Sequence, residues 1–207
     1  MNRFIDSPFY QALCGIVDLV IMNVLFLLCC LPVFTIGASV TALNSSTHML
    51  ITESPFSAKR FIISFKAGFK QSTLAFFAGV IGAVILILDS WIISLKMQSF
   101  ARYPILGIIL SVLIIWVLSL SYFFHLSSAT EHSFKDKVLL SVYSSLKYLP
   151  RSIVTLVLSL IPILLFFLWS YAFMVTLIFW LLIGFSLISY VNSLLLRPTF
   201  QTTGKKF

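Results

Sequence analysis

Apolar runs of about 20 residues recur along the whole chain and leave little sequence outside them. A helix needs about 20 mainly apolar residues to cross the hydrocarbon core of a bilayer. The composition agrees, since 60% of the 207 residues are hydrophobic and only 10% are charged, whereas a soluble domain has about 25% charged residues. We therefore predict an all-α, polytopic membrane protein that forms one integral membrane domain over residues 1–207.

The runs predict six transmembrane helices and two amphipathic helices. The six predicted spans are about 11–31, 35–52, 72–95, 104–126, 152–169 and 173–196, and the amphipathic segments are 58–70 and 133–149. Pro32 should end the first helix, and Thr35 should cap the next one. The span 35–52 is short and polar, so five spans remain the alternative to six.

The basic residues indicate how the chain lies in the membrane. The net charge is +8, but the lysines and arginines gather at the ends of apolar runs, which is typical of membrane topology and not of a nucleic-acid-binding surface. With six spans, all of them lie on the side of the two termini except Lys96 and Arg102. With five spans, only the N-terminus changes side. Both amphipathic segments and the C-terminus are therefore predicted to be cytoplasmic.

Polar residues inside the first two spans are the candidates for a functional site. Asp18 lies within the first run, where a carboxylate is costly. It either serves function, or it lies near the interface or pairs with a basic loop residue that holds helices together. Gly37, Thr41, Asn44 and His48 recur at i, i+4, i+7 and i+11, on one face of a helix. This face either lines a polar cavity or packs against other helices through small residues and hydrogen bonds.

The two amphipathic segments are the candidate surface for lipid or a partner. In 58–70, phenylalanines recur every four residues and lysines lie on the opposite face, which is typical of a helix at a membrane surface. In 133–149, an apolar stripe that includes Phe134 and Val138 is opposed by basic residues in the same way. The residues proposed for this surface are Phe61, Phe65, Lys66, Phe69, Lys70, Lys147 and Arg151.

The sequence offers no spacing that would predict an enzyme or a metal site. The three cysteines, Cys14, Cys29 and Cys30, all fall in the first run, and no histidine or carboxylate ligands are grouped near them. The chain also lacks a convincing nucleophile and base. We therefore predict a non-enzymatic protein without catalytic residues, metal or cofactor.

One continuous stretch, residues 26–39 (FLLCCLPVFTIGAS), resembles the hallmark of the YesL-like family. Phe9-Tyr10, Asp18, Ser64-Phe65-Lys66 with Phe69-Lys70-Gln71, and Leu149-Pro150-Arg151 also fit that family. The resemblance implies a small integral membrane protein of the bacterial cytoplasmic membrane, in a family of unknown function. Its members are often encoded beside carbohydrate ABC importers, which implies a link to sugar uptake by association only.

Two functions are therefore expected. The first is a non-enzymatic accessory protein or subunit associated with carbohydrate (oligosaccharide) ABC import, whose partners are the lipid bilayer and the importer subunits. Importer permeases of this class carry a cytoplasmic Glu-Ala-Ala motif followed by a glycine. The corresponding residues 127–150 contain no glycine, so the chain is not expected to engage the ATPase as those permeases do. The second is a small transporter or channel that acts on its own as a homo-oligomer.

Overall fold

The computed structural model describes residues 8–52, 56–96, 100, 102–129, 133–168 and 177–203, which are helical almost throughout and include no strand. The helices are α1 (Pro8–Cys30), a short 3-10 helix (Val33–Thr35), α2 (Ile36–Thr52), α3 (Ala58–Lys96), α4 (Arg102–Ala129), α5 (Phe134–Lys147), α6 (Leu149–Leu168), a π-helical segment (Trp180–Gly184) and α8 (Phe185–Thr203). The predicted all-α class is confirmed.

Four helical segments are long and apolar enough to cross a membrane: Leu13–Cys30, Ala58–Lys96, Arg102–Ser128 and Leu177–Leu196. They support the prediction of a polytopic membrane protein. Helix α2 and the apolar part of α6 are shorter, so the count of six spans stays a prediction. The tight turn expected between 169 and 173 lies outside the described residues.

The break between α1 and α2 forms at the predicted place, but Thr35 acts differently from the prediction. Helix α1 ends at Cys30, just before Pro32. The hydroxyl of Thr35 donates to the carbonyl oxygens of Cys29 and Pro32, at 2.5 and 2.6 Å. Thr35 therefore bonds the Cys29 carbonyl, one of those that the end of α1 leaves free, whereas we expected it to cap the start of α2.

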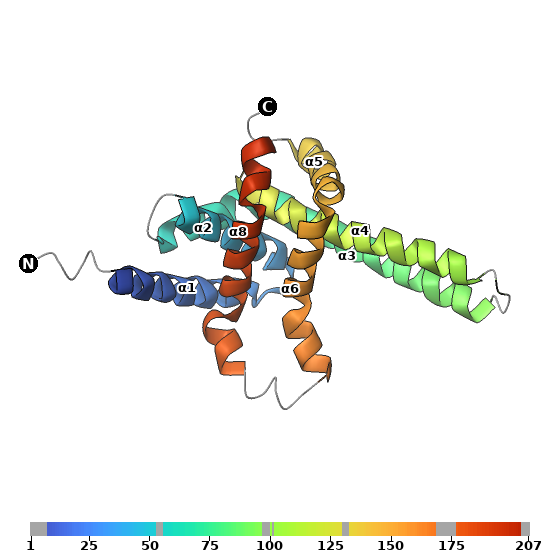
Figure 1. Cartoon of the computed structure of the whole chain (residues 1–207), viewed down its shortest axis with the longest axis horizontal. Helices are drawn as coiled ribbons and strands as arrows, with labels where there is room; N and C mark the ends of the chain where they lie inside the picture. The colour runs from blue at the N-terminus through green and yellow to red at the C-terminus, as the bar shows by residue number, and fades with distance from the viewer. Residues whose placement is uncertain are drawn as a thin grey trace, which may run out of the picture.

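Helix α2 lies at the centre of the bundle. It packs against α1, α3, α4 and α8, as Figure 1 shows from one side, and residues 37–47 are buried except for the half-buried Val40. Its small residues permit this close packing. A Cβ atom on Gly37 would collide with the carbonyl oxygen of Ser72 on α3 and lie 2.8 Å from the Cβ of Phe76. The hydroxyl of Thr41 donates to Ser72 Oγ at 2.8 Å.

Helix α3 is one continuous helix of 39 residues, where the sequence predicted a separate amphipathic helix 58–70 before a span 72–95. No proline lies at the junction, and Gly68 just before it stays within the helix, so the helix continues there. The first part of α3 packs on α2, and Phe61 is fully buried in a core with Met22 and Phe26.

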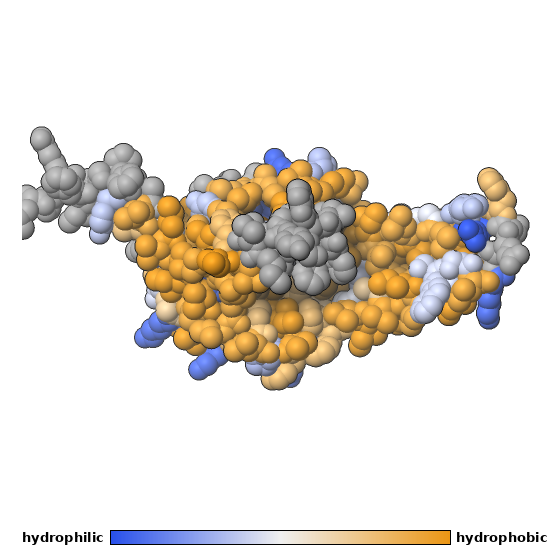
Figure 2. Space-filling model, turned by 90° about the horizontal axis from the view of Figure 1, so that it is seen from below, coloured by the Kyte–Doolittle hydropathy of each residue, from blue (hydrophilic) through white to orange (hydrophobic). Residues whose placement is uncertain are grey.

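The far halves of α3 and α4 extend together beyond the other helices (Figure 1). Close contacts hold the pair: Cβ atoms on Gly79 and Gly82 would lie 2.6 Å from the side chains of Leu120 and Trp116, and Trp116 Nε1 donates to the Gly79 carbonyl at 3.0 Å. The outward surface of this arm is largely hydrophobic (Figure 2), as a surface that faces lipid must be.

Helices α6 and α8 run side by side and cross the direction of α1, α3 and α4 (Figure 1). The π-helical segment ahead of α8 is fixed by Asn23, which is fully buried on α1. The Asn23 amide nitrogen donates to the carbonyls of Trp180 and Leu181 at 3.0 and 2.7 Å, and its oxygen accepts from the backbone N–H of Ser186 at 2.9 Å. One side chain therefore sets the register at which α8 begins.

Candidate binding cavity

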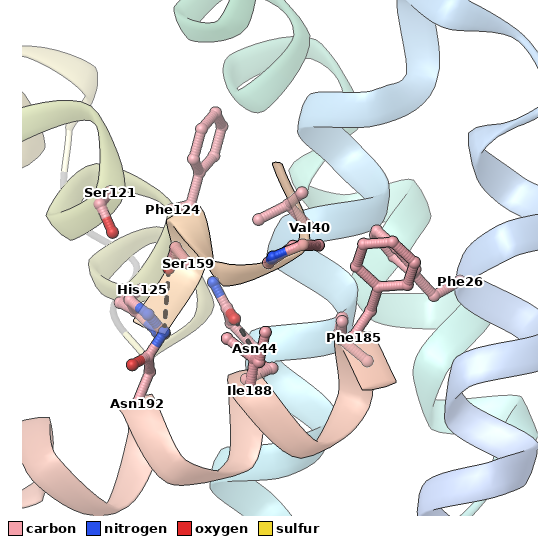
Figure 3. A pocket seen from close by; sticks show the side chains of 13 residues that line it. Phe26, Val40, Asn44, Ser121, Phe124, His125, Ser159, Phe185, Ile188 and Asn192 are labelled. Carbon is pink, nitrogen blue, oxygen red and sulfur yellow. Dashed lines mark hydrogen bonds between the residues drawn. The ribbon is translucent and has the colours of Figure 1, made fainter. Parts of the chain in front are cut away.

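A cavity of about 510 Å³ lies between α2, α4, α6 and α8, with one wall residue from α1. Each helix contributes residues spaced three or four apart, so each presents a single face to it. The lining residues are Phe26 from α1; Val40, Leu43 and Asn44 from α2; Ser121, Phe124 and His125 from α4; Ser159 and Pro162 from α6; and Phe185, Ile188, Ser189 and Asn192 from α8 (Figure 3). Such a volume is typical of a small-molecule site, for which about 300–1,000 Å³ is usual.

The polar groups of the cavity gather where α8 faces α2 and α6. Ser189 donates to Asn44 Oδ1 at 2.7 Å, and Asn192 Nδ2 donates to Ser159 Oγ at 3.3 Å, as the dashed lines in Figure 3 mark. Asn192 is only 3% exposed, yet its Oδ1 has no hydrogen-bond partner among the described residues. A buried amide oxygen without a partner is costly, and this atom exposes less than 1 Å² of its surface, so it lies behind the wall of the cavity and not on its open surface.

The remaining walls are mainly apolar, with Ser121 and His125 of α4 as their polar residues. Phe26 and Phe185 are in contact, with ring centroids 5.6 Å apart, and aliphatic side chains continue this surface. The lining residues that the structure describes include no aspartate, glutamate, lysine or arginine, and His125, which is 4% exposed, is the one histidine among them. A charged molecule would therefore lose its hydration without gaining an ionic partner, and the cavity suits an uncharged ligand.

The residues of the predicted polar face of α2 take both roles that the sequence left open, which are helix packing and cavity lining. Gly37 and Thr41 pack against α3. Asn44 turns to α8 and lines the cavity. His48 is half-buried and lies close enough to His125 to interact with it electrostatically. Helix packing and cavity lining thus lie one after the other along α2.

Asp18 lies outside the cavity and contacts a loop. Its Oδ2 accepts a hydrogen bond of 3.3 Å from the backbone N–H of Phe56, just ahead of α3. This partner is a backbone N–H and not the basic side chain that the pairing alternative expected, and the role of Asp18 stays a prediction.

The predicted lipid or partner surface is only partly exposed. On α3, Phe61 is fully buried, Phe65 and Phe69 are half-buried, and Lys66 and Lys70 are exposed. The phenylalanine stripe of α3 therefore faces mostly inward, because α2 lies against it.

The apolar face of α5 points mostly outward, whereas that of α3 points mostly inward. Helix α5 packs its serines and Lys137 against the bundle, and Phe134 of the predicted apolar stripe packs on Phe123. The rest of its apolar surface is open, with Leu139 74% and Tyr143 57% exposed. The ammonium of Lys147 lies 5.4 Å from the ring centre of Tyr143, and hydrogen bonding to this tyrosine raises the pKa of Lys147. Arg151, at the start of α6, is half-buried, with its guanidinium 5.8 Å from the ring centre of Tyr148.

Four polar residues of the lining were not predicted from the sequence: His125, Ser159, Ser189 and Asn192. A signal for Asn192 was present, because an amide inside an apolar run is as notable as Asp18 in the first run. Which helix would face Asn192 depends on the crossing of α6 and α8, and periodicity within one helix does not give that. Among the described residues no group of three or more histidines, cysteines or carboxylates could hold a metal ion.

The fold and the cavity together define a helical membrane protein with a solute-sized cavity inside its bundle. Residues 19–90 match the family model described as "Protein of unknown function, DUF624". The match extends from α1 through most of α3, and it agrees with the resemblance to the YesL-like family. Searches of curated proteins and of solved structures gave no match.

Proposed function

We propose that this protein binds a small uncharged solute in the cavity between α2, α4, α6 and α8 and acts as a small transporter in the bacterial cytoplasmic membrane. The observation that carries the proposal is the cavity of about 510 Å³, which apolar side chains line together with the amides of Asn44 and Asn192. Transport proteins commonly place a binding site between helices near the middle of the membrane.

The proposal includes six spans with the C-terminus in the cytoplasm. The surroundings of α2 support a crossing, because its hydroxyl and amide groups face other helices and not lipid. Thr47, for example, is fully buried and lies 3.1 and 3.0 Å from the hydroxyls of Ser189 and Ser193. Polar groups at membrane depth are tolerated when they are satisfied inside the bundle.

A filled-cavity variant tests the binding function. Ser121 lines the cavity, is half-buried, and lies on the α4 face next to Phe124, so Ser121→Phe should occupy the space a solute needs. Ser111→Phe is the matched control, because Ser111 lies on the exposed arm of the same helix and bonds only to the Ile108 carbonyl at 2.7 Å.

The wild type and both variants are purified in mild detergent, and their bound small molecules are identified by mass spectrometry. We expect a molecule that the wild type and Ser111→Phe retain and that Ser121→Phe loses. Identical small-molecule content in all three proteins would refute solute binding. Flux of the identified solute into liposomes then tests transport.

The accessory role in carbohydrate ABC import is the second candidate, and the open apolar stripe of α5 favours it. Leu139 and Tyr143 project from the bundle beside the cationic Lys147, on the side predicted to face the cytoplasm, where an importer subunit could dock. Co-purification from the native membrane tests this role. Importer subunits that remain bound to the wild type and are lost from Leu139→Glu would support it, and their absence from the wild type would count against it.

A further inference from the structure

We infer that the junction of α5 and α6 binds an anionic phospholipid, whose phosphate contacts Lys147 and Arg151 beside Tyr148 and whose acyl chains cover the open apolar face of α5. This surface lies outside the cavity, so the inference goes beyond the proposed solute binding and does not depend on it. It follows from the polarity of the two faces of α5 and from the cations at its end.

The polar face of α5 points into the bundle. Its buried polar side chains are at most 6% exposed: Lys137, Ser141, Ser144 and Ser145. Lys137 Nζ donates to Gln71 Oε1 on α3 at 3.0 Å, and Ser145 Oγ lies 3.2 Å from Ser119 Oγ on α4. A helix at a water-facing surface places its polar groups outside, whereas a helix in a membrane satisfies them against its neighbours.

Between its charged ends, the outward face of α5 is apolar, and this face continues onto α6. The exposed apolar residues are Val138, Leu139, Val142, Tyr143 and Leu146 on α5 and Leu149, Ile153, Val154 and Val157 on α6. Because α6 is a predicted span, its exposed surface faces lipid, and acyl chains that cover α6 also reach α5. Figure 1 shows α5 at the end of the bundle at which α8 also ends, which is the end predicted to face the cytoplasm.

Two cations lie at the end of this apolar face, against one tyrosine ring. The Lys147 ammonium is 5.4 Å from the ring centre of Tyr148, and the Arg151 guanidinium is 5.8 Å from it. Among the described residues, no carboxylate forms an ion pair with either cation. Tyrosines are enriched at the head-group level of a bilayer, and lysine and arginine bind phosphate there. A phospholipid head group therefore supplies the anion that this pair of cations lacks.

An anionic phospholipid is the occupant that matches both parts of this surface. Free phosphate would bind the two cations and leave the apolar face of α5 in water, where an exposed apolar patch is unfavourable. An uncharged lipid would cover the apolar face and leave the cations without an anion. An importer subunit can reach α5 from the cytoplasm, but the apolar face continues onto α6 within the predicted span, where lipid is the neighbour.

Titration of the full chain with short-chain lipids in mild detergent tests the site, with thermal unfolding as the readout. Dioctanoyl phosphatidylglycerol carries both acyl chains and a net negative charge. Dioctanoyl phosphatidylcholine lacks the net charge, and glycerophosphate lacks the acyl chains. We expect phosphatidylglycerol to raise the unfolding temperature, because a ligand that binds the native state stabilises it. The two comparison probes should need at least about tenfold more for the same rise. Equal action of either one, or no action of phosphatidylglycerol, would overturn the inference.

Removal of the two cations tests where the lipid binds. Lys147→Gln/Arg151→Gln should need about thirtyfold more phosphatidylglycerol, which is the loss of two basic residues at a lipid surface. Lys66→Gln/Lys70→Gln is the matched control, because it removes two cations with the same spacing on the same predicted side of the membrane. Both lysines are exposed on α3, where the phenylalanine stripe points mostly inward, so this control should bind phosphatidylglycerol as the wild type does. Equal weakening in both variants would overturn the site.

A second measurement tests the bilayer cover without changing the cations. On a cysteine-free background, Leu139→Cys carries a nitrobenzoxadiazole label in nanodiscs of phosphatidylcholine and phosphatidylglycerol. Ile85→Cys is the lipid-facing control, because Ile85 is 52% exposed on the apolar arm. We expect nitroxide-bearing lipid to quench both labels and aqueous iodide to quench neither. Iodide quenching at Leu139→Cys alone would overturn the inference and leave the face of α5 open to a protein partner. If the glutamine variant of the two cations does not fold, this measurement and the probes on the wild type still decide.

Discussion

The contact between α2 and α3 at Gly37 leads to a sharp stability prediction. Gly37→Ala adds one methyl group at a place where it would collide with the Ser72 carbonyl oxygen and lie 2.8 Å from the Cβ of Phe76. Both atoms are fixed to the α3 backbone, so no side chain can turn away. The two helices must therefore separate, which also weakens the hydrogen bond of 2.8 Å between Thr41 and Ser72.

The expected change in the free energy of unfolding combines two destabilising effects and one stabilising effect. Overpacking a core by a methyl group costs about 1–3 kcal/mol. Loss of an interhelical hydrogen bond in a membrane protein costs about 0.6 kcal/mol more. Replacing glycine by alanine inside a helix returns about 0.5–1 kcal/mol. We therefore expect a net loss of about 1–3 kcal/mol, and a fall in unfolding temperature of about 2–4 °C for each kcal/mol.

Thermal unfolding in detergent measures the effect against a matched control. Gly107 lies inside α4 with nothing within 4 Å of an added Cβ, so Gly107→Ala should be neutral or stabilising by up to about 1 kcal/mol. An unfolding temperature for Gly37→Ala equal to or above that of Gly107→Ala would refute the close packing of α2 on α3.

Two further predictions concern α8 and the topology. Asn23→Leu should destabilise the protein by about 2 kcal/mol, because three hydrogen bonds to the segment around Trp180 are lost at about 0.6 kcal/mol each. Thermal unfolding measures this loss, and a variant as stable as the wild type would contradict the prediction. On a cysteine-free background, Lys66→Cys and Lys147→Cys should resist an impermeant thiol reagent in intact cells, since the positive-inside bias predicts both in the cytoplasm; strong labelling of either would contradict the orientation.

The helices could be predicted from the sequence because apolar runs and Pro32 determine them locally. The continuity of α3 could not, because the change from a basic to an apolar pattern near residue 71 looks like a boundary although it contains no helix-breaking residue. The phenylalanine stripe of α3 is a similar case. An amphipathic stripe shows that one face needs burial, and whether lipid, a partner or α2 covers it depends on tertiary packing.

The cavity was predictable in part. Asn44 could be named because it shares a helical face with Gly37 and Thr41. The sequence did not show that α3 covers one part of this face and α8 the other. Asn192 pairs with Ser159 at a separation of 33 residues, and no local pattern relates the two. Long-range helix crossing therefore decides which polar residues line the cavity and which only join helices.

The central claim is that the bundle contains a space that small molecules can enter, and cysteine accessibility tests it most directly. On a cysteine-free background, Ile188→Cys places a thiol on the cavity wall, and Ile178→Cys places one on a surface that is 67% exposed. The labelling rate of each by a small methanethiosulfonate reagent is measured with and without Ser121→Phe. The account predicts that filling the cavity slows labelling at Ile188→Cys about tenfold or more, by blocking access, and leaves Ile178→Cys unchanged. Equal slowing at both positions, or none at Ile188→Cys, would contradict it.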